Sequence, residues 1–153
     1  MNLLDVNILV YAFRQDSPRH QEYRAWLLNL INGPEKYGLA ELALMGMIRI
    51  TTNNKIFKHP SSLAEVIAFT NALKQPLNCC IVRPYPNHWS TFIKTCQQVN
   101  AKGNLITDAW FAALAIESQC VWITSDRDFA RFPNLLWQHP LDHNQPVQNP
   151  DFQ

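Results

Sequence analysis

Glycine is scarce in this sequence, with only 4 among 153 residues. Neither a G-x-G-x-x-G segment nor a G-x-x-x-x-G-K segment is present. Such loops let the backbone approach the phosphates of dinucleotides and nucleoside triphosphates closely. Their absence argues against both of these cofactor classes.

Net charge and long apolar runs are lacking as well. The formal net charge is only +1, so the chain has no general positive field, and any RNA would have to bind a local patch. No apolar run reaches the ~18–20 residues of a membrane span. The N-terminal segment has no cationic start and is interrupted by Asp5 and Asn7, unlike a signal peptide. We therefore expect a soluble, cytoplasmic protein without a membrane partner.

The sequence also lacks the cysteine and histidine spacings that are typical of zinc sites and of histidine-based catalytic sites. The four cysteines form no C-x-x-C pair. Each has apolar neighbours, so we expect the cysteines to be small buried residues of a protein in a reducing compartment. Among the histidines, only His139 and His143 have an i, i+4 spacing, and they lie in a proline-flanked segment. The sequence therefore argues against a zinc centre and a Ser-His-Asp triad.

The composition is that of an ordinary globular domain. Hydrophobic residues make up 47% of the chain, and a chain of this length buries most of the surface that it exposes when unfolded. We expect one domain over residues 1–140. Residues 141–153 are polar and contain proline, so we expect a loose C-terminal tail.

Short apolar segments alternate with helical patterns along the whole domain. Strands are expected at residues 2–5, 37–40, 79–83, 120–124 and 135–137. Helices are expected at residues 18–30, 41–51, 62–75, 87–100, 107–118 and 126–132, the first with Ser17 as N-cap and Pro18 at the first helical position. Residues 7–13 fit either a helix or an extended segment. This alternation predicts an α/β fold whose mainly parallel sheet carries helices on both faces.

Acidic residues recur where the expected strands end. Asp5 follows the first strand, Glu41 the second, and Ser125-Asp126 the strand at 120–124. Ligands of parallel α/β sheets bind outside the carboxyl ends of the strands. The acids are therefore expected at the edge of the sheet where chemistry takes place.

Each acid also has a purely structural interpretation. Asp5 is placed to cap the following helix, and Ser125 or Asp126 to cap the helix at residues 126–132. Asp108 lies in the first turn of a helix, where it complements the helix dipole, and Asp128 fits a solvated helix position. Taken together, however, carboxylates from separate stretches offer the oxygen ligands that magnesium prefers, and magnesium can assist phosphodiester hydrolysis.

Three segments resemble one family in the same order along the chain. They are LLDVNILVYAFRQDSPRH at the start, GLAELALMGMIRITTNNKIF in the middle, and GNLITDAWFAALAIESQCVWITSDRDFARFPNLLW near the end. The first resembles the opening of PIN domains. The last resembles their closing half, with its D-x-x-x-A-A-x-A helix and T-x-D-x-D-F turn. Over about residues 2–138 the chain is similar to the VapC-like, toxin-type branch.

The resemblance implies a three-layer α/β/α PIN-like fold and a magnesium-dependent endoribonuclease, with manganese as the alternative ion. It implies the toxin of a type II toxin–antitoxin pair, with RNA as substrate, a cognate antitoxin and a homodimer. Asp5, Asp108 and Asp126 would hold the metal, and Glu41 would be a further catalytic acid. Candidate supporting residues at or near the site are Asn7, Arg49, Asn104, Ser125 and Asp128.

One position departs from the family pattern. Many PIN domains carry a glutamate where this chain has Gly46. Glu41 precedes it by five residues, and five residues turn a helix by ~140°, so the two positions are not equivalent. We expect Glu41 to complete the acidic set; its alternative role is to complement the helix dipole.

Two other functions are compatible with parts of the pattern. A catalytically silent PIN fold would serve as an RNA-binding or protein-interaction module, and the absence of the usual glutamate favours it. A response-regulator-like domain would use Asp5 as a phosphoacceptor. The latter needs a lysine at a strand end, and no expected strand end supplies one.

Overall fold

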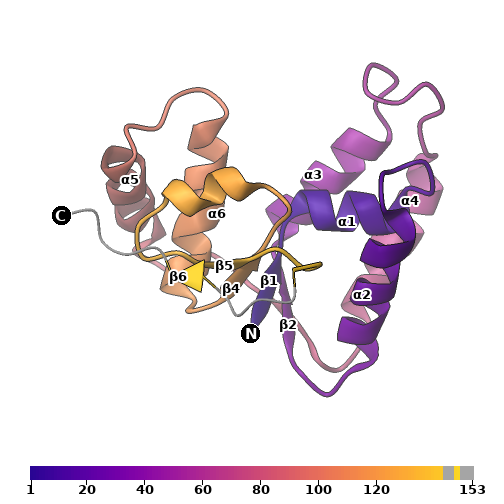
Figure 1. Cartoon of the computed structure of the whole chain (residues 1–153), viewed down its shortest axis with the longest axis horizontal. Helices are drawn as coiled ribbons and strands as arrows, with labels where there is room; N and C mark the ends of the chain where they lie inside the picture. The colour runs from indigo at the N-terminus through magenta and orange to yellow at the C-terminus, as the bar shows by residue number, and fades with distance from the viewer. Residues whose placement is uncertain (143–146, 149–153) are drawn as a thin grey trace.

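A mainly parallel sheet forms the centre of the computed structural model, which describes residues 1–142 and 147–148 (Figure 1). Its strand order is β3-β2-β1-β4-β5-β6, and only the β5–β6 pair is antiparallel. The strands are β1 (Asn2–Leu4), β2 (Tyr37–Leu39), β3 (Cys79–Ile81), β4 (Val121–Ile123), β5 (Leu136–Gln138) and β6 (Val147–Gln148). The expected α/β class and the mainly parallel sheet are confirmed.

Helices cover both faces of the sheet. One group packs on the right in Figure 1 and consists of α1 (Val6–Phe13), α2 (His20–Asn32), α3 (Glu41–Thr51) and α4 (Leu63–Lys74). The group on the left consists of α5 (His88–Gln98), α6 (Leu105–Glu117) and the short 3-10 helix η1 (Arg127–Arg131). The sheet and its two helical covers form three layers, as expected.

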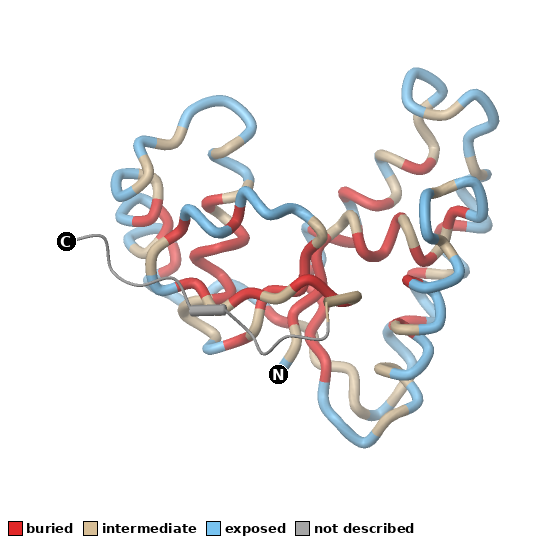
Figure 2. Tube along the Cα trace, in the orientation of Figure 1, coloured by how far each residue is buried: buried red, intermediate tan, exposed pale blue. Residues whose placement is uncertain are grey.

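Side chains alternate between the two faces of the sheet along each strand, and this explains why helices pack on both faces. Leu3 and Trp122 are fully buried against the α5–α6 layer, whereas their neighbours Leu4 and Ile123 are buried in the cluster of α1–α4. Successive residues of a strand point to opposite faces, so each three-residue strand contributes to two cores. Figure 2 shows the buried residues concentrated along the strands and the inner sides of the helices.

The strand order contains a reversal between β1 and β4. From β1 the chain proceeds outward through β2 to β3, and then returns to place β4 on the other side of β1. Such a switch point opens a crevice outside the carboxyl ends of the two strands. Asp5 lies directly at this point, because its backbone N–H donates to the carbonyl of Ile123 at 3.0 Å.

Several helix boundaries differ from those expected. The start at Ser17-Pro18 is wrong: α2 begins at His20, after Arg19 adopts a left-handed φ of 54°. Arg14 explains part of the delay, since its guanidinium binds Asp16 and its carbonyl accepts from the N–H of Ser17. Residues 7–13 are helical and belong to α1.

The C-terminal tail is only partly described. Val147–Gln148 pair with β5, so these two residues extend the sheet rather than forming part of a loose tail. The remaining tail positions, 143–146 and 149–153, lie outside the described residues. Within the described part of the chain, no helix combines the length and apolarity that crossing a membrane requires.

The start of α4 supplies a direct test of helix capping. Ser62 accepts from the N–H of Glu65 at 3.2 Å, and the Glu65 side chain accepts from the N–H of Ser62 at 2.9 Å. Ser62→Ala should lower the free energy of unfolding by about 1 kcal/mol in urea titration, because a helix donor loses its partner. Ser90→Ala, at an exposed position inside α5, is the control and should change it little.

Candidate active site

A cleft of about 420 Å³ lies at the switch point and brings three of the expected acids together. Asp5, Asp108 and Asp126 all line it, although they come from the end of β1, the first turn of α6 and the end of β4. The remaining lining is mostly apolar and comes from α1, α3, the residues after α3, α6 and η1. The site therefore combines a carboxylate group with an apolar wall.

Asp5 is the buried member of the group, with only 7% of its surface exposed. It occupies the N-cap position of α1, yet its side chain makes no capping hydrogen bond, so the capping interpretation is wrong. Instead, Oδ2 accepts from the hydroxyl of Thr124 at 2.6 Å and from the amide of Asn7 at 2.9 Å. These two donors hold the carboxylate in position.

Burial raises the pKa of Asp5 to about 7, with Asp108 and Asp126 adding to the effect, while the Thr124 hydrogen bond opposes it. Loss of water disfavours the charged form of a carboxyl group. The Asp5 carboxylate is therefore a group for which a nearby cation would be strongly favourable.

Asp108 is partly buried and also lines the cleft. Desolvation and, to a smaller extent, the nearby carboxylates of Asp126 and Asp128 raise its pKa to about 6, while Arg131 acts in the opposite direction. A first-turn acid that only complemented the helix dipole would have its charged form stabilised. The electrostatics of Asp108 are instead those of a member of a crowded acidic group.

Asp126 is exposed and has a structural role in addition to its place in the cleft. Its Oδ1 accepts from the N–H of Asp128 at 2.8 Å and so caps η1, which is the alternative expected from the sequence. Capping engages one carboxylate oxygen and does not prevent the second from binding a ligand. Asp128 itself lies outside the cleft lining and forms an ion pair with Arg131 at 3.6 Å.

Thr124 is a supporting residue that the sequence did not reveal. It is fully buried, and its hydroxyl accepts from the backbone N–H of Asp126 at 3.0 Å while donating to Asp5. It therefore joins two of the three acids. The signal for it was its place immediately before Ser125-Asp126, in the T-x-D-x-D-F turn.

The expected supporting residues divide into two groups. Asn7 bridges Asp5 and Thr124 through its side-chain Nδ2, and its side-chain Oδ1 accepts from the backbone N–H of Ser125 at 3.3 Å. Arg49 lines the cleft. Asn104 precedes α6, is exposed, does not line the cleft, and its side chain does not cap the helix.

Glu41 is not brought to this cleft. It is exposed, lies 3.5 Å from the guanidinium of Arg83, and lines a separate groove between α3 and α4. Gly46, by contrast, lines the cleft, and a Cβ atom there would lie 3.1 Å from a methyl group of Val6. The rotation of ~140° between the two positions places them on different sides of α3.

The ligand set fits a hard divalent cation. Three carboxylates provide the oxygen ligands that Mg²⁺ and Mn²⁺ favour, and a shared cation would offset both the desolvation and the smaller mutual repulsion that raise the pKa of Asp5 and Asp108. Among residues 1–142 and 147–148, however, no three His, Cys, Asp or Glu side chains lie close enough to form a preformed metal centre. An ion would therefore keep several waters, as Mg²⁺ often does.

Comparison with known proteins gives this cleft a family context. Residues 3–135 match the PIN domain. The chain belongs to the PIN-domain family. A VapC ribonuclease of Mycobacterium bovis is 42% identical over 93% of this chain and 97% of its own length. Ribonuclease VapC25 of Mycobacterium tuberculosis is 36% identical over 92% of this chain and 99% of its own length.

Solved structures support the PIN-domain fold. The VapBC2 structure from Rickettsia felis, bound to a DNA fragment from its promoter, has a TM-score of 0.66 at 17% identity, covering 90% of this chain and 96% of the matched one. VapC20 of Mycobacterium tuberculosis, described as a toxin that cleaves the sarcin-ricin loop, has a TM-score of 0.62 at 11% identity, covering 85% and 93%. The family and fold implied by the sequence motifs are confirmed.

The electrostatics of this PIN domain predict a pH dependence. Because the pKa of Asp5 is higher in the folded chain than in an unfolded one, its stabilising contribution is complete at low pH and is lost as the pH rises through about 7. Asn at position 5 keeps an acceptor for Thr124 without the charge. At pH 8 in EDTA, Asp5→Asn should therefore raise the melting temperature by roughly 3–8 °C, and the gain should disappear near pH 4.

The control for this measurement is Glu35→Gln, at an exposed position before β2. It should leave the melting temperature within about one degree of the parent at both pH values. A large loss of stability in Asp5→Asn at pH 8 would contradict the prediction, because it would mean that the Asp5 charge stabilises the fold.

Proposed function

We propose that this PIN domain is a divalent-metal-dependent endoribonuclease and the toxin of a type II toxin–antitoxin pair. The observation that carries the proposal is the meeting of Asp5, Asp108 and Asp126 in one cleft at the switch point of the sheet. The relatives named ribonucleases, at 36–42% identity over more than nine tenths of this chain, support the activity.

The three aspartates would hold Mg²⁺, or Mn²⁺ in its place. When bound, such an ion activates water and neutralises the charge that develops during phosphodiester hydrolysis. Thr124 and Asn7 keep the Asp5 carboxylate oriented toward the cleft through their hydrogen bonds to Oδ2. The buried position of Asp5 also limits its contact with bulk water, which strengthens its attraction for a cation.

Arg49 is the cationic residue of the cleft wall. It is exposed, lines the cleft with the three aspartates, and has no ion-pair partner among residues 1–142 and 147–148. A guanidinium group binds phosphate oxygens with two parallel hydrogen bonds. We assign Arg49 to the phosphate of the RNA strand, rather than to an acid of the site.

A protein partner is part of the proposal. Similar folds include a toxin–antitoxin complex from Klebsiella pneumoniae, with a TM-score of 0.62 at 20% identity, covering 93% of this chain and 99% of the matched one. Its description, together with the VapBC2 structure, supports a cognate antitoxin for this chain. A homodimer is proposed from the family resemblance and is tested by the molar mass in solution.

A catalytically silent PIN fold is the second candidate. Position 46, where many family members carry a glutamate, lines the cleft here as glycine. The site consequently has one acid fewer than the family pattern. Such a protein would bind RNA but would not cleave it, so a cleavage assay separates the two candidates.

The principal experiment is cleavage of a single-stranded RNA by the isolated chain with Mg²⁺. The parent should cleave, EDTA should abolish the reaction, and Asp108→Asn should lower kcat/KM by at least about 100-fold, because a carboxylate ligand is lost while the shape is kept. Equal activity in Asp108→Asn and the parent would exclude the proposed site.

Glu41→Gln is an internal test of the acidic set. Since Glu41 lies outside the cleft and beside Arg83, we expect this variant to cleave RNA within about twofold of the parent at limiting Mg²⁺. Asp126→Asn, which alters a residue of the cleft, should require more Mg²⁺ for half-maximal rate. A rise in the Mg²⁺ requirement of Glu41→Gln would instead make Glu41 a contributor to the metal site.

A further inference from the structure

Charge is unevenly distributed along this nearly neutral chain. Residues 42–107 contain seven lysines and arginines but a single acid, Glu65. The remaining residues contain six lysines and arginines and eleven acids. A net charge of +1 therefore conceals a basic central segment, and its location in the fold decides whether it can attract an anionic ligand.

Two raised loops carry part of this basic segment. One, here called the lysine loop, is residues 52–62 between α3 and α4; the other is the α5–α6 loop, residues 99–104. Figure 1 shows them projecting at the same end of the molecule, one from each helical layer. Figure 2 shows both as largely exposed.

The acidic cleft lies between the layers that carry these loops. Its lining includes Ile56 and Phe57 of the lysine loop on one side, and Thr107 and Asp108, just beyond the α5–α6 loop, on the other. Arg49 also lines the cleft. A strand seated over the aspartates would consequently run between the two loops.

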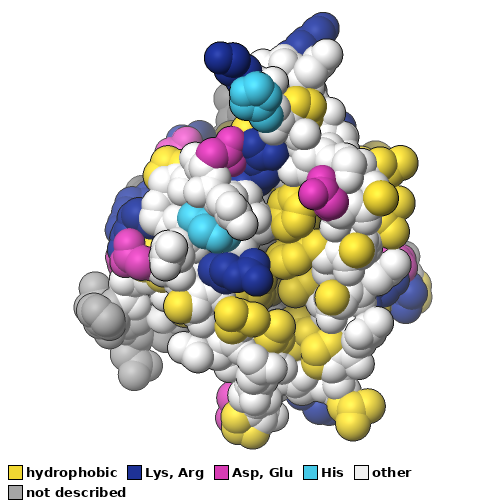
Figure 3. All heavy atoms as spheres, turned by 90° about the vertical axis from the view of Figure 1, so that its right-hand side faces the viewer, with side chains coloured by type: hydrophobic (Ala, Val, Ile, Leu, Met, Phe, Trp, Pro, Cys, Tyr) yellow, Lys and Arg dark blue, Asp and Glu magenta, His cyan; other side chains and the backbone are white. Residues whose placement is uncertain are grey.

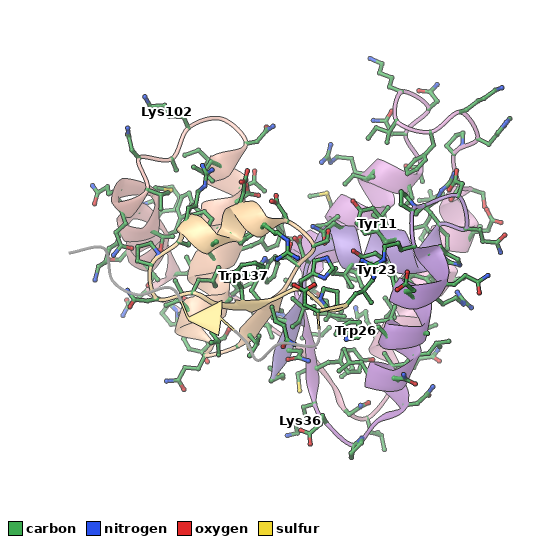
Figure 4. All side chains as sticks on the ribbon, viewed as in Figure 1. Tyr11, Tyr23, Trp26, Lys36, Lys102 and Trp137 are labelled. Carbon is green, nitrogen blue, oxygen red and sulfur yellow. The ribbon has the colours of Figure 1, made fainter. Side chains whose placement is uncertain are left out.

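The lysines of the loops are available for a ligand. Lys55, Lys58 and Lys102 are exposed, and within residues 1–142 and 147–148 none of them forms an ion pair with a carboxylate. Neither loop contains an Asp or a Glu. Figure 3 shows cationic and histidine side chains at the end of the α1–α4 face where the lysine loop projects, and Figure 4 places Lys102 at the corresponding end of the other layer.

The lysine loop is held in place by a buried arginine. Arg14 is 9% exposed, and its Nη1 donates to the carbonyl of His59 at 3.0 Å and to the hydroxyl of Ser61 at 2.8 Å. Its guanidinium carbon lies 4.1 Å from the centre of the Phe57 ring. These contacts anchor the loop to the end of α1, so less conformational entropy is lost when a ligand binds.

The α5–α6 loop has a defined shape as well. Asn100 has a φ of 49° and Gly103 a φ of 56°, and the N–H of Ala101 donates to the carbonyl of Cys96 at 2.9 Å. These turns close α5 and lead directly into α6. Lys102 is therefore presented by a loop whose backbone is hydrogen-bonded at both ends, since the N–H of Leu105 donates to the carbonyl of Lys102.

We propose that the lysine loop and the α5–α6 loop form a two-sided clamp for the backbone of single-stranded RNA, with Lys55 and Lys58 on one side of the acidic cleft and Lys102 on the other. The clamp supplies the local positive charge that the whole chain lacks. It also explains how an anionic substrate approaches a cleft lined by three aspartates. This inference rests on the proposed ribonuclease function.

The test is the salt dependence of RNA binding. A fluorescent, mixed-sequence single-stranded RNA is titrated with the full chain in EDTA, which prevents cleavage, and fluorescence anisotropy gives Kd at several NaCl concentrations. Each phosphate contact contributes a slope of about −0.7 to log K against log salt for single strands. The double variant Lys55→Ala/Lys58→Ala should reduce the slope by about 1.4, and Lys102→Ala by about 0.7.

The matched control removes the same charge elsewhere. Arg24 and Lys36 are exposed, without an ion-pair partner among the described residues, and Figure 4 shows Lys36 at the end of the molecule opposite to Lys102. Arg24→Ala/Lys36→Ala should leave the slope unchanged. In the Mg²⁺ assay, the loop variants should raise KM and leave kcat within about twofold of the parent.

The outcomes separate this inference from the proposed function. A parent chain that neither binds nor cleaves RNA overturns the proposed function and the clamp with it. A parent that binds and cleaves, with slopes unchanged in the loop variants, overturns the clamp alone. The clamp is also overturned if these variants retain RNA affinity but lose affinity for poly-glutamate, because the loops would then bind an acidic protein.

Discussion

The site depends on one carboxyl group, that of Asp5, whose burial disfavours its ionised form. Asp5 lies directly after β1 and is buried, and its pKa rises to about 7 mainly because burial disfavours the ionised form. Thr124 and Asn7 donate hydrogen bonds to the same oxygen and partly compensate for the lost water. Because this arrangement spans β1, α1 and β4, the geometry of the cleft follows from the pairing of the central strands.

Buried apolar residues on the strands around Asp5 stabilise the fold and offset the cost of burying this carboxyl group. The strands are only three residues long in this region, but each contributes to a core on both faces, with fully buried Leu3, Leu4, Trp122 and Ile123. Burial of that apolar surface stabilises the sheet by roughly 1.5–3 kcal/mol for each fully buried side chain. A bound divalent cation would stabilise the charged forms of Asp5 and Asp108, which burial and the neighbouring carboxylates disfavour.

Sequence patterns were informative about those features that depend on neighbouring residues. The alternation of short apolar runs and helical patterns predicted the layers, and the helical pattern at residues 62–75 predicted α4 to within one residue at each end. Sequence patterns were less informative where a contact with another part of the chain decides where a helix begins or which residue supports the site. The turn around Ser17 continues to Arg19 partly because Arg14 binds Asp16. Thr124 was overlooked since its importance comes from Asp5, 119 residues away in sequence.

The sequence alone determined the family and the fold class: the order of three motifs indicated the first, and short apolar runs alternating with helical patterns indicated the second. Aspartates after apolar strands predicted, in addition, a hard-metal site at one edge of the sheet. Only the tertiary structure decided which acids share a cleft. Asp5 and Asp126 meet because β1 and β4 are adjacent in the sheet, and Asp108 joins them from the first turn of α6. Glu41 stays outside, although it also follows a strand, because the direction of a side chain depends on helical rotation as well as on position along the chain. The same holds for the lysine loop and the α5–α6 loop, which are far apart in sequence. Packing of the two helical layers on one sheet brings both loops to the same end of the molecule.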